Sequence, residues 1–110
     1  MTKFGPLSFV MLLHGITIPE QPLAEFCRKH CVARLSLFGS ILRDDFRPDS
    51  DVDVLVEFSP GVAYSLLDLG GMLVELQAML GREVDLKTPA FLSPRLRAAV
   101  SQQAKVLYAA

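Results

Sequence analysis

Residues 51–58, which read DVDVLVEF, constrain the fold more than any other segment of the chain. Side chains two positions apart in an extended strand point to the same side, so this segment has two distinct faces. One face is apolar and the other is mainly acidic: the first comprises Val52, Val54, Val56 and Phe58, and the second comprises Asp51, Asp53, Leu55 and Glu57. The segment therefore predicts a strand whose apolar face covers a core and whose other face presents carboxylates.

Segments before and after this strand predict helices and further strands in alternation. Residues 19–30 are typical of a helix, because a proline and acidic residues come early and basic residues come last. We expect a second helix between the capping box Ser65-x-x-Asp68 and the stop at Gly81, and a third behind the cap Ser93 that ends at about residue 103. The remaining elements are predicted strands at residues 33–38 and 82–87, a short helical segment from Ser40 to about Asp45, and a last short strand or a tail at residues 105–108. This order predicts an α/β (α+β) fold in which helices flank a small central mixed β-sheet.

The predicted helix between Ser65 and Gly81 is apolar around most of its circumference, which is more than one sheet face needs. We expect a well-buried crossover helix. The alternative is a surface that binds a partner protein, for which the methionines and the Gly70-Gly71 pair are suited.

The length and charge of the chain bound its domain count and its partners. A chain of 110 residues forms one compact core and is too short for two. We expect a minimal domain over residues 14–110, preceded by an uncertain extension over residues 1–13, with either Met1 or Met11 as the natural start. A net charge of -1 and a pI near 6.1 do not fit a basic nucleic-acid-binding face, so we expect no direct nucleic-acid binding.

Residues 7–13 form an apolar run behind a lysine, as in a signal peptide. This run is far shorter than the roughly 20 residues of a membrane span, and no small-x-small cleavage site follows it. We expect a cytoplasmic protein without membrane association. In that compartment Cys27 and Cys31 are expected to be buried free thiols rather than a disulfide or part of a zinc site.

Two carboxylates at the head of the predicted strand suggest metal-assisted chemistry. Asp51 and Asp53 have Cα atoms roughly 6.6 Å apart on one side of the strand, so their carboxylates can converge. Two such groups can hold a pair of divalent cations about 3.5–4 Å apart, which assists displacement at phosphorus. Hard oxygen ligands favour Mg2+ or Mn2+. Asp85, on the polar side of another predicted strand, supplies a third carboxylate if the two strands are neighbours.

Competing with this interpretation is a solvated acidic face, which is the more common reason for an isolated Asp-x-Asp. Gly39 and Ser40 argue against it. They lie between a predicted strand and a predicted helical segment, where backbone N–H groups stabilise a phosphate. Only a short loop separates them from Asp51, so the phosphate turn and the carboxylates can meet.

The letters GS at positions 39–40, DVD at 51–53 and VDL at 84–86 together resemble the signature of minimal nucleotidyltransferase (MNT) domains of the DNA-polymerase-β-like superfamily. The resemblance implies a polymerase-β-like palm fold. It also implies that Gly39 and Ser40 bind the nucleotide triphosphate and that Asp51 and Asp53 ligate two Mg2+ ions. Asp85 would complete the metal site and orient or deprotonate the acceptor hydroxyl.

Many members of this superfamily read GSxARG at the phosphate turn. This chain keeps the arginine as Arg43 and lacks the glycine after it. By the resemblance, Arg43 is a further nucleotide-binding residue.

Stand-alone members of the family resemble antitoxins, which are encoded with a HEPN-domain ribonuclease toxin, and some transfer AMP from ATP to a tyrosine of the toxin. We therefore expect a Mg-dependent protein adenylyltransferase with a HEPN toxin as its partner, and 110 residues leave no room for a separate acceptor domain. Two alternatives remain: a non-catalytic antitoxin that acts by complex formation, and a nucleotidyltransferase acting on a small-molecule antibiotic. The sequence leaves the nucleotide preference and homo-oligomer formation open.

Overall fold

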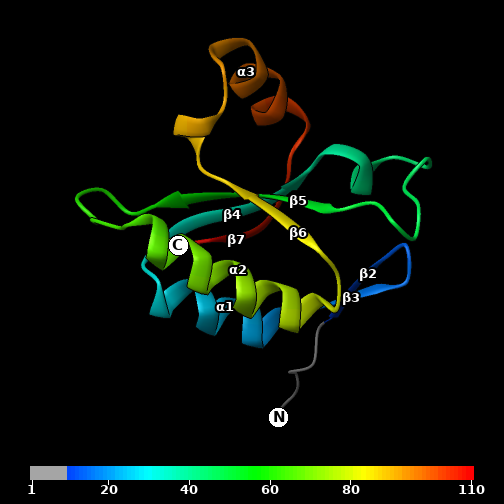
Figure 1. The fold of residues 1–110 in the computed structure, drawn as a ribbon, viewed down its shortest axis with the longest axis horizontal. Helices are drawn as coiled ribbons and strands as arrows, with labels where there is room; N and C mark the ends of the chain where they lie inside the picture. The colour runs from blue at the N-terminus through cyan, green and yellow to red at the C-terminus, as the bar shows by residue number, and fades with distance from the viewer. Residues whose placement is uncertain (1–9) are drawn as a thin grey trace.

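Four strands form a mixed sheet in the order β6-β5-β4-β7 in the computed structural model, which describes residues 10–110 (Figure 1). β4 runs antiparallel to both β5 and β7, whereas β6 runs parallel to β5. The bounds are Val32–Phe38 for β4, Val52–Phe58 for β5, Val84–Lys87 for β6 and Lys105–Ala109 for β7. Because β5 and β6 are parallel, their first residues lie at the same edge of the sheet, and this edge carries the predicted carboxylates.

Helices cover both faces of the sheet. α1 (Glu20–Lys29) and α2 (Leu66–Leu80) lie against one face, and α3 (Pro94–Gln103) lies over the other (Figure 1). Two short 3-10 helices, η1 (Gly39–Leu42) and η2 (Pro89–Phe91), follow β4 and β6 respectively. The predicted α/β fold with a small central mixed sheet is confirmed.

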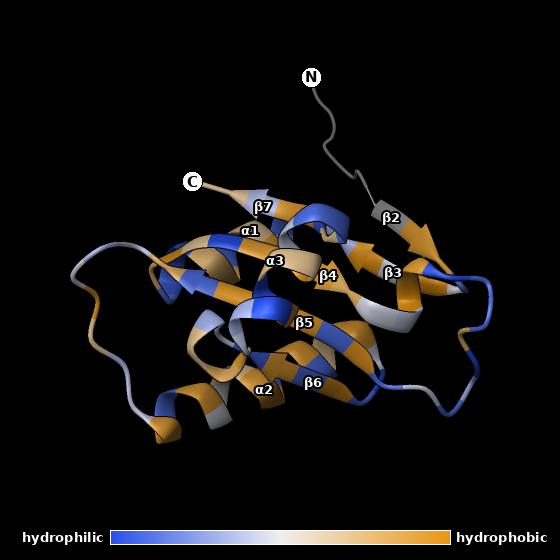
Figure 2. Ribbon diagram, turned by 90° about the horizontal axis from the view of Figure 1, so that it is seen from above, coloured by the Kyte–Doolittle hydropathy of each residue, from blue (hydrophilic) through white to orange (hydrophobic). Residues whose placement is uncertain are grey.

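The core follows the alternation of β5. Val52, Val54 and Val56 are at most 1% exposed and pack against α1 and α2 in the larger hydrophobic cluster. Leu55 points to the opposite face, where it joins a smaller cluster under α3. The members of that smaller cluster are Phe38, Leu55, Leu92 and Val100. Both faces of the sheet are therefore partly covered, and hydrophobic positions alternate with hydrophilic ones along its strands (Figure 2).

A separate hairpin precedes α1. β2 (Val10–Leu13) and β3 (Ile16–Pro19) pair antiparallel through a two-residue loop at His14 and Gly15, both of which have positive φ. Ile16 and Ile18 of β3 are buried in the larger cluster. The domain boundary predicted between residues 13 and 14 falls within this hairpin and stays a prediction, and residues 1–9 of the predicted extension lie outside the described residues.

The predicted caps of α2 are confirmed. The Ser65 side chain accepts from the Asp68 N–H at 3.1 Å, and Asp68 accepts from the Ser65 N–H at 2.8 Å. Gly81 ends the helix in the left-handed conformation at φ 69°. The local sequence determines both ends, so they could be read without knowledge of the tertiary structure.

The prediction that α2 is well buried is wrong. Only Met72, Leu76 and Leu80 are buried, because the sheet and its neighbours cover a single stripe of the helix. On the outer side three large apolar side chains are exposed: Leu66 to 77%, Leu67 to 85% and Val74 to 64%. α2 is therefore buried along one side only, although its sequence is apolar on nearly all sides.

Two further sequence expectations are wrong. The helical segment predicted to reach about Asp45 ends at Leu42, because Arg43 adopts an extended backbone at φ -119° and ψ 163°. Cys31, expected to be buried, is exposed, because it lies in the turn after α1 at φ 58°. Cys27 is a buried free thiol, as predicted. No helix among the described residues has the length and apolar character needed to cross a membrane.

Candidate active site

Asp53 lies at the centre of the candidate site. It is the second residue of β5, and its Cα is in register with Phe38 on one side and with Asp85 on the other. Neighbouring strands lie about 4.8 Å apart. The parallel pairing of β5 with β6 therefore brings Asp53 and Asp85 together. From the sequence, this proximity is expected only if the two strands are neighbours.

Gly39 makes room for the Asp53 carboxylate. It follows Phe38 directly and has a φ of 77°, a conformation that glycine adopts without strain. A Cβ atom added at Gly39 would overlap the Oδ2 atom of Asp53 and would lie 3.1 Å from its Cγ. Gly39 is thus required here both by its backbone conformation and by the closeness of the carboxylate, and the turn and the carboxylate form one unit.

The electrostatic environment of Asp53 disfavours its charged form. Burial raises the pKa of the Asp53 carboxyl above its ordinary value, and the charge of Asp85 raises it further. Lys87 opposes this effect, while Asp51 adds a smaller upward contribution to the same pKa. Asp53 is therefore a partly buried carboxyl in a field of like charge, which a bound cation would relieve.

Asp85 is paired with a lysine of its own strand. Lys87 Nζ lies 3.0 Å from Oδ1 and 3.1 Å from Oδ2 of Asp85, so the ammonium contacts both carboxylate oxygens. Asp51, in contrast, is exposed and precedes the first residue of β5. The strand predicted to begin at Asp51 therefore begins one residue later, and Asp51 lies at the entrance to the site rather than within the sheet.

The carboxylates fit a divalent cation by their chemistry. Within residues 10–110, no three His, Cys, Asp or Glu side chains converge closely enough to hold a metal ion as they stand. Asp53 and Asp85 nevertheless offer hard oxygen donors from adjacent strands, and Asp51 lies two residues from Asp53. Burial and then the charge of Asp85 raise the pKa of Asp53, and a cation between these groups would offset the repulsion.

Ser40 and Arg43 lie at opposite ends of η1. Ser40 is its second residue and lines a hollow of about 550 Å3 that the loop after η1 completes. Arg43 follows η1, and its Nε donates to Asp45 Oδ1 at 3.1 Å. The structure thus brings Gly39, Ser40 and Asp53 to one corner of the sheet, whereas the Arg43 guanidinium contacts the neighbouring loop.

Comparison with known proteins identifies the family. Residues 20–107 match the family model described as "Nucleotidyltransferase domain". The chain belongs to the nucleotidyltransferase domain family. A Methanocaldococcus jannaschii protein named "putative protein adenylyltransferase" is 43% identical over 76 residues, which cover 69% of this chain and 80% of that protein. The chain is a nucleotidyltransferase, and the resemblance seen in its GS and DVD letters is confirmed.

Solved structures agree with this assignment. A "putative minimal nucleotidyltransferase" is 36% identical and matches with a TM-score of 0.66, covering 77% of this chain and 85% of that one. A toxin–antitoxin structure with AMP-PNP matches with a TM-score of 0.67 at 22% identity, covering 83% and 73%. A tri-AMPylated HEPN toxin of Shewanella oneidensis in complex with an MNT antitoxin matches with a TM-score of 0.60 at 22% identity, covering 83% and 70%. At 22% identity these last two show the shared fold alone.

Sequence reasoning missed two basic residues at the candidate site. One is Lys87, described above. The other is Arg82, whose guanidinium donates to the carbonyl oxygens of Arg47 at 3.1 Å and Ser50 at 2.7 Å and lies over the Phe46 ring at 4.8 Å. Arg82 therefore holds the loop that leads into Asp51. No local pattern marks such a residue, since its partners are more than thirty positions earlier in the chain.

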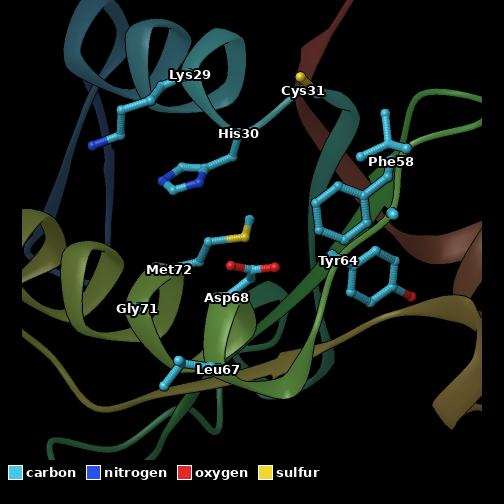
Figure 3. A pocket seen from close by; sticks show the side chains of 11 residues that line it. Lys29, His30, Cys31, Phe58, Tyr64, Leu67, Asp68, Gly71 and Met72 are labelled. Atoms are coloured by element: carbon cyan, nitrogen blue, oxygen red, sulfur yellow. The ribbon is translucent and has the colours of Figure 1, made fainter.

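A second pocket, of about 400 Å3, lies at the other end of β5 (Figure 3). Phe58, the last residue of β5, stacks on Tyr64 with ring centroids 4.2 Å apart, and the end of α1 forms the opposite wall. On that wall Lys29 and His30 both contact Glu75 of α2, at 2.7 and 2.9 Å. None of the residues lining this pocket was predicted to act in nucleotidyl transfer, so it is separate from the candidate site.

Proposed function

We propose that this nucleotidyltransferase transfers AMP from ATP to a hydroxyl, most simply a tyrosine, of a HEPN-type toxin in the cytoplasm and thereby neutralises it. The observation that carries the proposal is the register of Asp53 with Asp85, next to the turn at Gly39. The name of the Methanocaldococcus jannaschii relative and the AMPylated toxin in the Shewanella oneidensis complex support the choice of AMP and of partner.

The reaction class determines what the site must do. The acceptor oxygen attacks the α-phosphorus of ATP, the bond from that phosphorus to the bridging oxygen breaks, and pyrophosphate leaves with the electron pair. The hydroxyl proton passes to a base. We assign to Asp85 the role of orienting the hydroxyl and accepting this proton. Asp51, Asp53 and Asp85 would hold two Mg2+ ions, which when bound neutralise developing charge on the attacking and leaving oxygens.

Gly39 and Ser40 have the role of positioning the triphosphate. The turn and the Asp53 carboxylate lie at the same corner, because a Cβ atom added at Gly39 would overlap Asp53 Oδ2. We assign the backbone N–H groups of the turn to hold the phosphates there. Holding the phosphates against this turn aligns the α-phosphorus with the carboxylates, and alignment of reacting groups lowers the barrier. Arg43 can join them only if it leaves Asp45, a rotation open to it because the pair is at the surface.

The test is transfer of label from α-labelled ATP to a purified HEPN-type toxin, with Mg2+ and with a chelator. Wild type should label the toxin only with the metal. Asp53→Asn and Asp85→Asn should each lower the rate about 100-fold or more, since metal charge stabilisation is worth several kcal/mol and each 1.4 kcal/mol is tenfold. Asp49→Asn is the matched control, because Asp49 is an exposed aspartate of the preceding loop.

Label transfer at the wild-type rate by Asp53→Asn would refute the assignment of the site. Label that appears on the toxin equally with and without the chelator would refute the need for a metal. Loss of transfer in the Asp49→Asn control would show that the whole loop, rather than the carboxylate set, governs the rate.

A second candidate is neutralisation by binding alone, and the exposed outer side of α2 favours it. An apolar helix face left uncovered suits a protein partner. In this case Asp53→Asn would still protect cells against the toxin, whereas Val74→Asp would not. If transfer is essential, Asp53→Asn fails to protect the cells.

A further inference from the structure

Lys87 occupies an unusual position for a surface lysine. It lies on β6 two residues after Asp85, so both side chains point to the same face of the sheet. Its ammonium contacts both oxygens of the Asp85 carboxylate, at 3.0 and 3.1 Å. The side chains are 34% and 42% exposed for Lys87 and Asp85. The pair is thus partly shielded from solvent, and both oxygens that Asp85 could give to a metal ion already have a positive partner.

The charge of Lys87 also reaches the next strand. Its Cα is in register with Leu55, two residues beyond Asp53 on β5. The charge of Lys87 lowers the pKa of Asp53, whereas the charge of Asp85 raises it. Both effects are expected if the Lys87 ammonium lies close to the two carboxylates. Lys87 therefore serves as a counter-ion for the carboxylates on β5 and β6 together.

We propose that Lys87 is a built-in counter-ion that competes with a divalent cation for Asp85 and must release this carboxylate before the ion can bind there. The inference rests on the proposed metal site and adds a residue that sets its affinity. Lys87 acts through Asp85 and is a positioning residue.

Competition follows from the geometry of the carboxylate. A Mg2+ ion that binds Asp85 must approach an oxygen at about 2.0–2.1 Å, and a positive ammonium beside the same oxygens repels it. The lysine stem is flexible, so the ammonium can swing away at little cost. The consequence is a metal-free site in which Lys87 offsets part of the repulsion between the carboxylates, and a metal affinity lower than three carboxylates alone would give.

The experiment is direct titration with Mn2+ in the absence of nucleotide, with free Mn2+ followed by its electron paramagnetic resonance signal. Lys87→Met keeps an unbranched apolar stem, one heavy atom shorter than the lysine side chain, and removes the charge. It should bind Mn2+ roughly fivefold more tightly than wild type, the factor expected for loss of one partly exposed ion pair. Lys87→Arg keeps the charge and should bind no more tightly than wild type.

The matched control is Lys29→Met, which changes the net charge of the chain by the same amount. Lys29 of α1 pairs with Glu75 of α2, on the face of the sheet that these two helices cover and away from Asp53 and Asp85. Its removal should leave Mn2+ affinity unchanged. An equal gain in both methionine variants would show that only the overall charge matters, and this would overturn the proposal for Lys87.

A fourth variant separates this inference from the proposed function. Asp53→Asn should weaken Mn2+ binding, because it removes a proposed ligand. If Asp53→Asn weakens binding and Lys87→Met leaves it unchanged, the metal site stands and the competition by Lys87 is refuted. If Asp53→Asn has no effect on binding, the metal site itself is refuted, and the role of Lys87 falls with it.

Discussion

Replacement of Gly39 by alanine tests how much room the turn leaves for the Asp53 carboxylate. The added Cβ would overlap the Oδ2 atom of Asp53, and the residue would have to keep a φ of 77°. Two penalties therefore act at once: the strain of a left-handed alanine and the displacement of a partly buried carboxylate. The prediction is a loss of both stability and nucleotidyl transfer.

The two penalties can be sized separately. A left-handed alanine costs about 1–2 kcal/mol, offset by about 0.4–1 kcal/mol from the lower entropy of the unfolded chain. Overlap with a packed neighbour costs about 1–3 kcal/mol more. Gly61→Ala supplies the first penalty alone, since Gly61 has a φ of 81° and nothing within 4 Å of an added Cβ. Gly39→Ala should therefore be less stable than Gly61→Ala by about 1–3 kcal/mol.

Urea unfolding followed by far-ultraviolet circular dichroism measures this difference, because the chain has no tryptophan for fluorescence. A double-mutant cycle assigns its cause. Asp53→Ala removes the overlapping carboxylate, so in the Gly39→Ala background it should recover most of the additional loss. The reasoning is refuted if the two glycine variants lose equal stability, or if Asp53→Ala gives no recovery.

Three further predictions concern single groups. Because burial and Asp85 raise the pKa of Asp53, the folded chain binds this proton more tightly than the unfolded chain, and the stability from this group is present at low pH and lost as pH rises through the folded pKa. Metal-free Asp53→Asn should therefore melt above wild type at neutral pH, with the gap closing toward acid; a constant gap would contradict this. Burial raises the pKa of the Cys27 thiol to about 12, so a thiol reagent should label only the exposed Cys31 in the native protein and both cysteines in denaturant. Ser65→Ala should cost about 1 kcal/mol, or a fall of about 4 °C in Tm, because the Asp68 N–H loses its acceptor; an unchanged Tm would mean that the first turn of α2 is frayed.

Local chemistry made part of the structure predictable. The alternation of β5, the capping box at Ser65 and the left-handed stop at Gly81 each involve residues within a few positions of one another. The helical pattern of α1 and the Ser93 cap of α3 belong to the same class. In each case the hydrogen bonds or the buried face are set by the segment itself.

Non-local pairing made the remainder unpredictable. Asp53 meets Asp85 only because β6 joins β5 in parallel with this exact register, and a shift of one residue would turn Asp85 to the other face. The anchoring of the 46–50 loop by Arg82 likewise joins residues more than thirty positions apart. The contact of Lys87 with Asp85 is local to β6, but only the pairing with β5 places it beside Asp53. The exposure of the outer side of α2 could not be predicted, because apolar residues give the same sequence pattern whether a core or a partner protein covers them.

Stability and function conflict at Asp53, and this conflict is the best guide to its role. A carboxylate kept only for structure would be stabilised by its surroundings, yet burial and Asp85 disfavour the charge of Asp53 while Lys87 offsets only part of the effect. Unfavourable charge retained at one corner of a sheet, beside a glycine that leaves it room, is expected of a group that needs a cation from outside. The decisive outcome is therefore a combined one in a single variant. If Asp53→Asn stabilises the metal-free chain, weakens Mn2+ binding and abolishes transfer, the unfavourable charge environment of Asp53 is the consequence of its function.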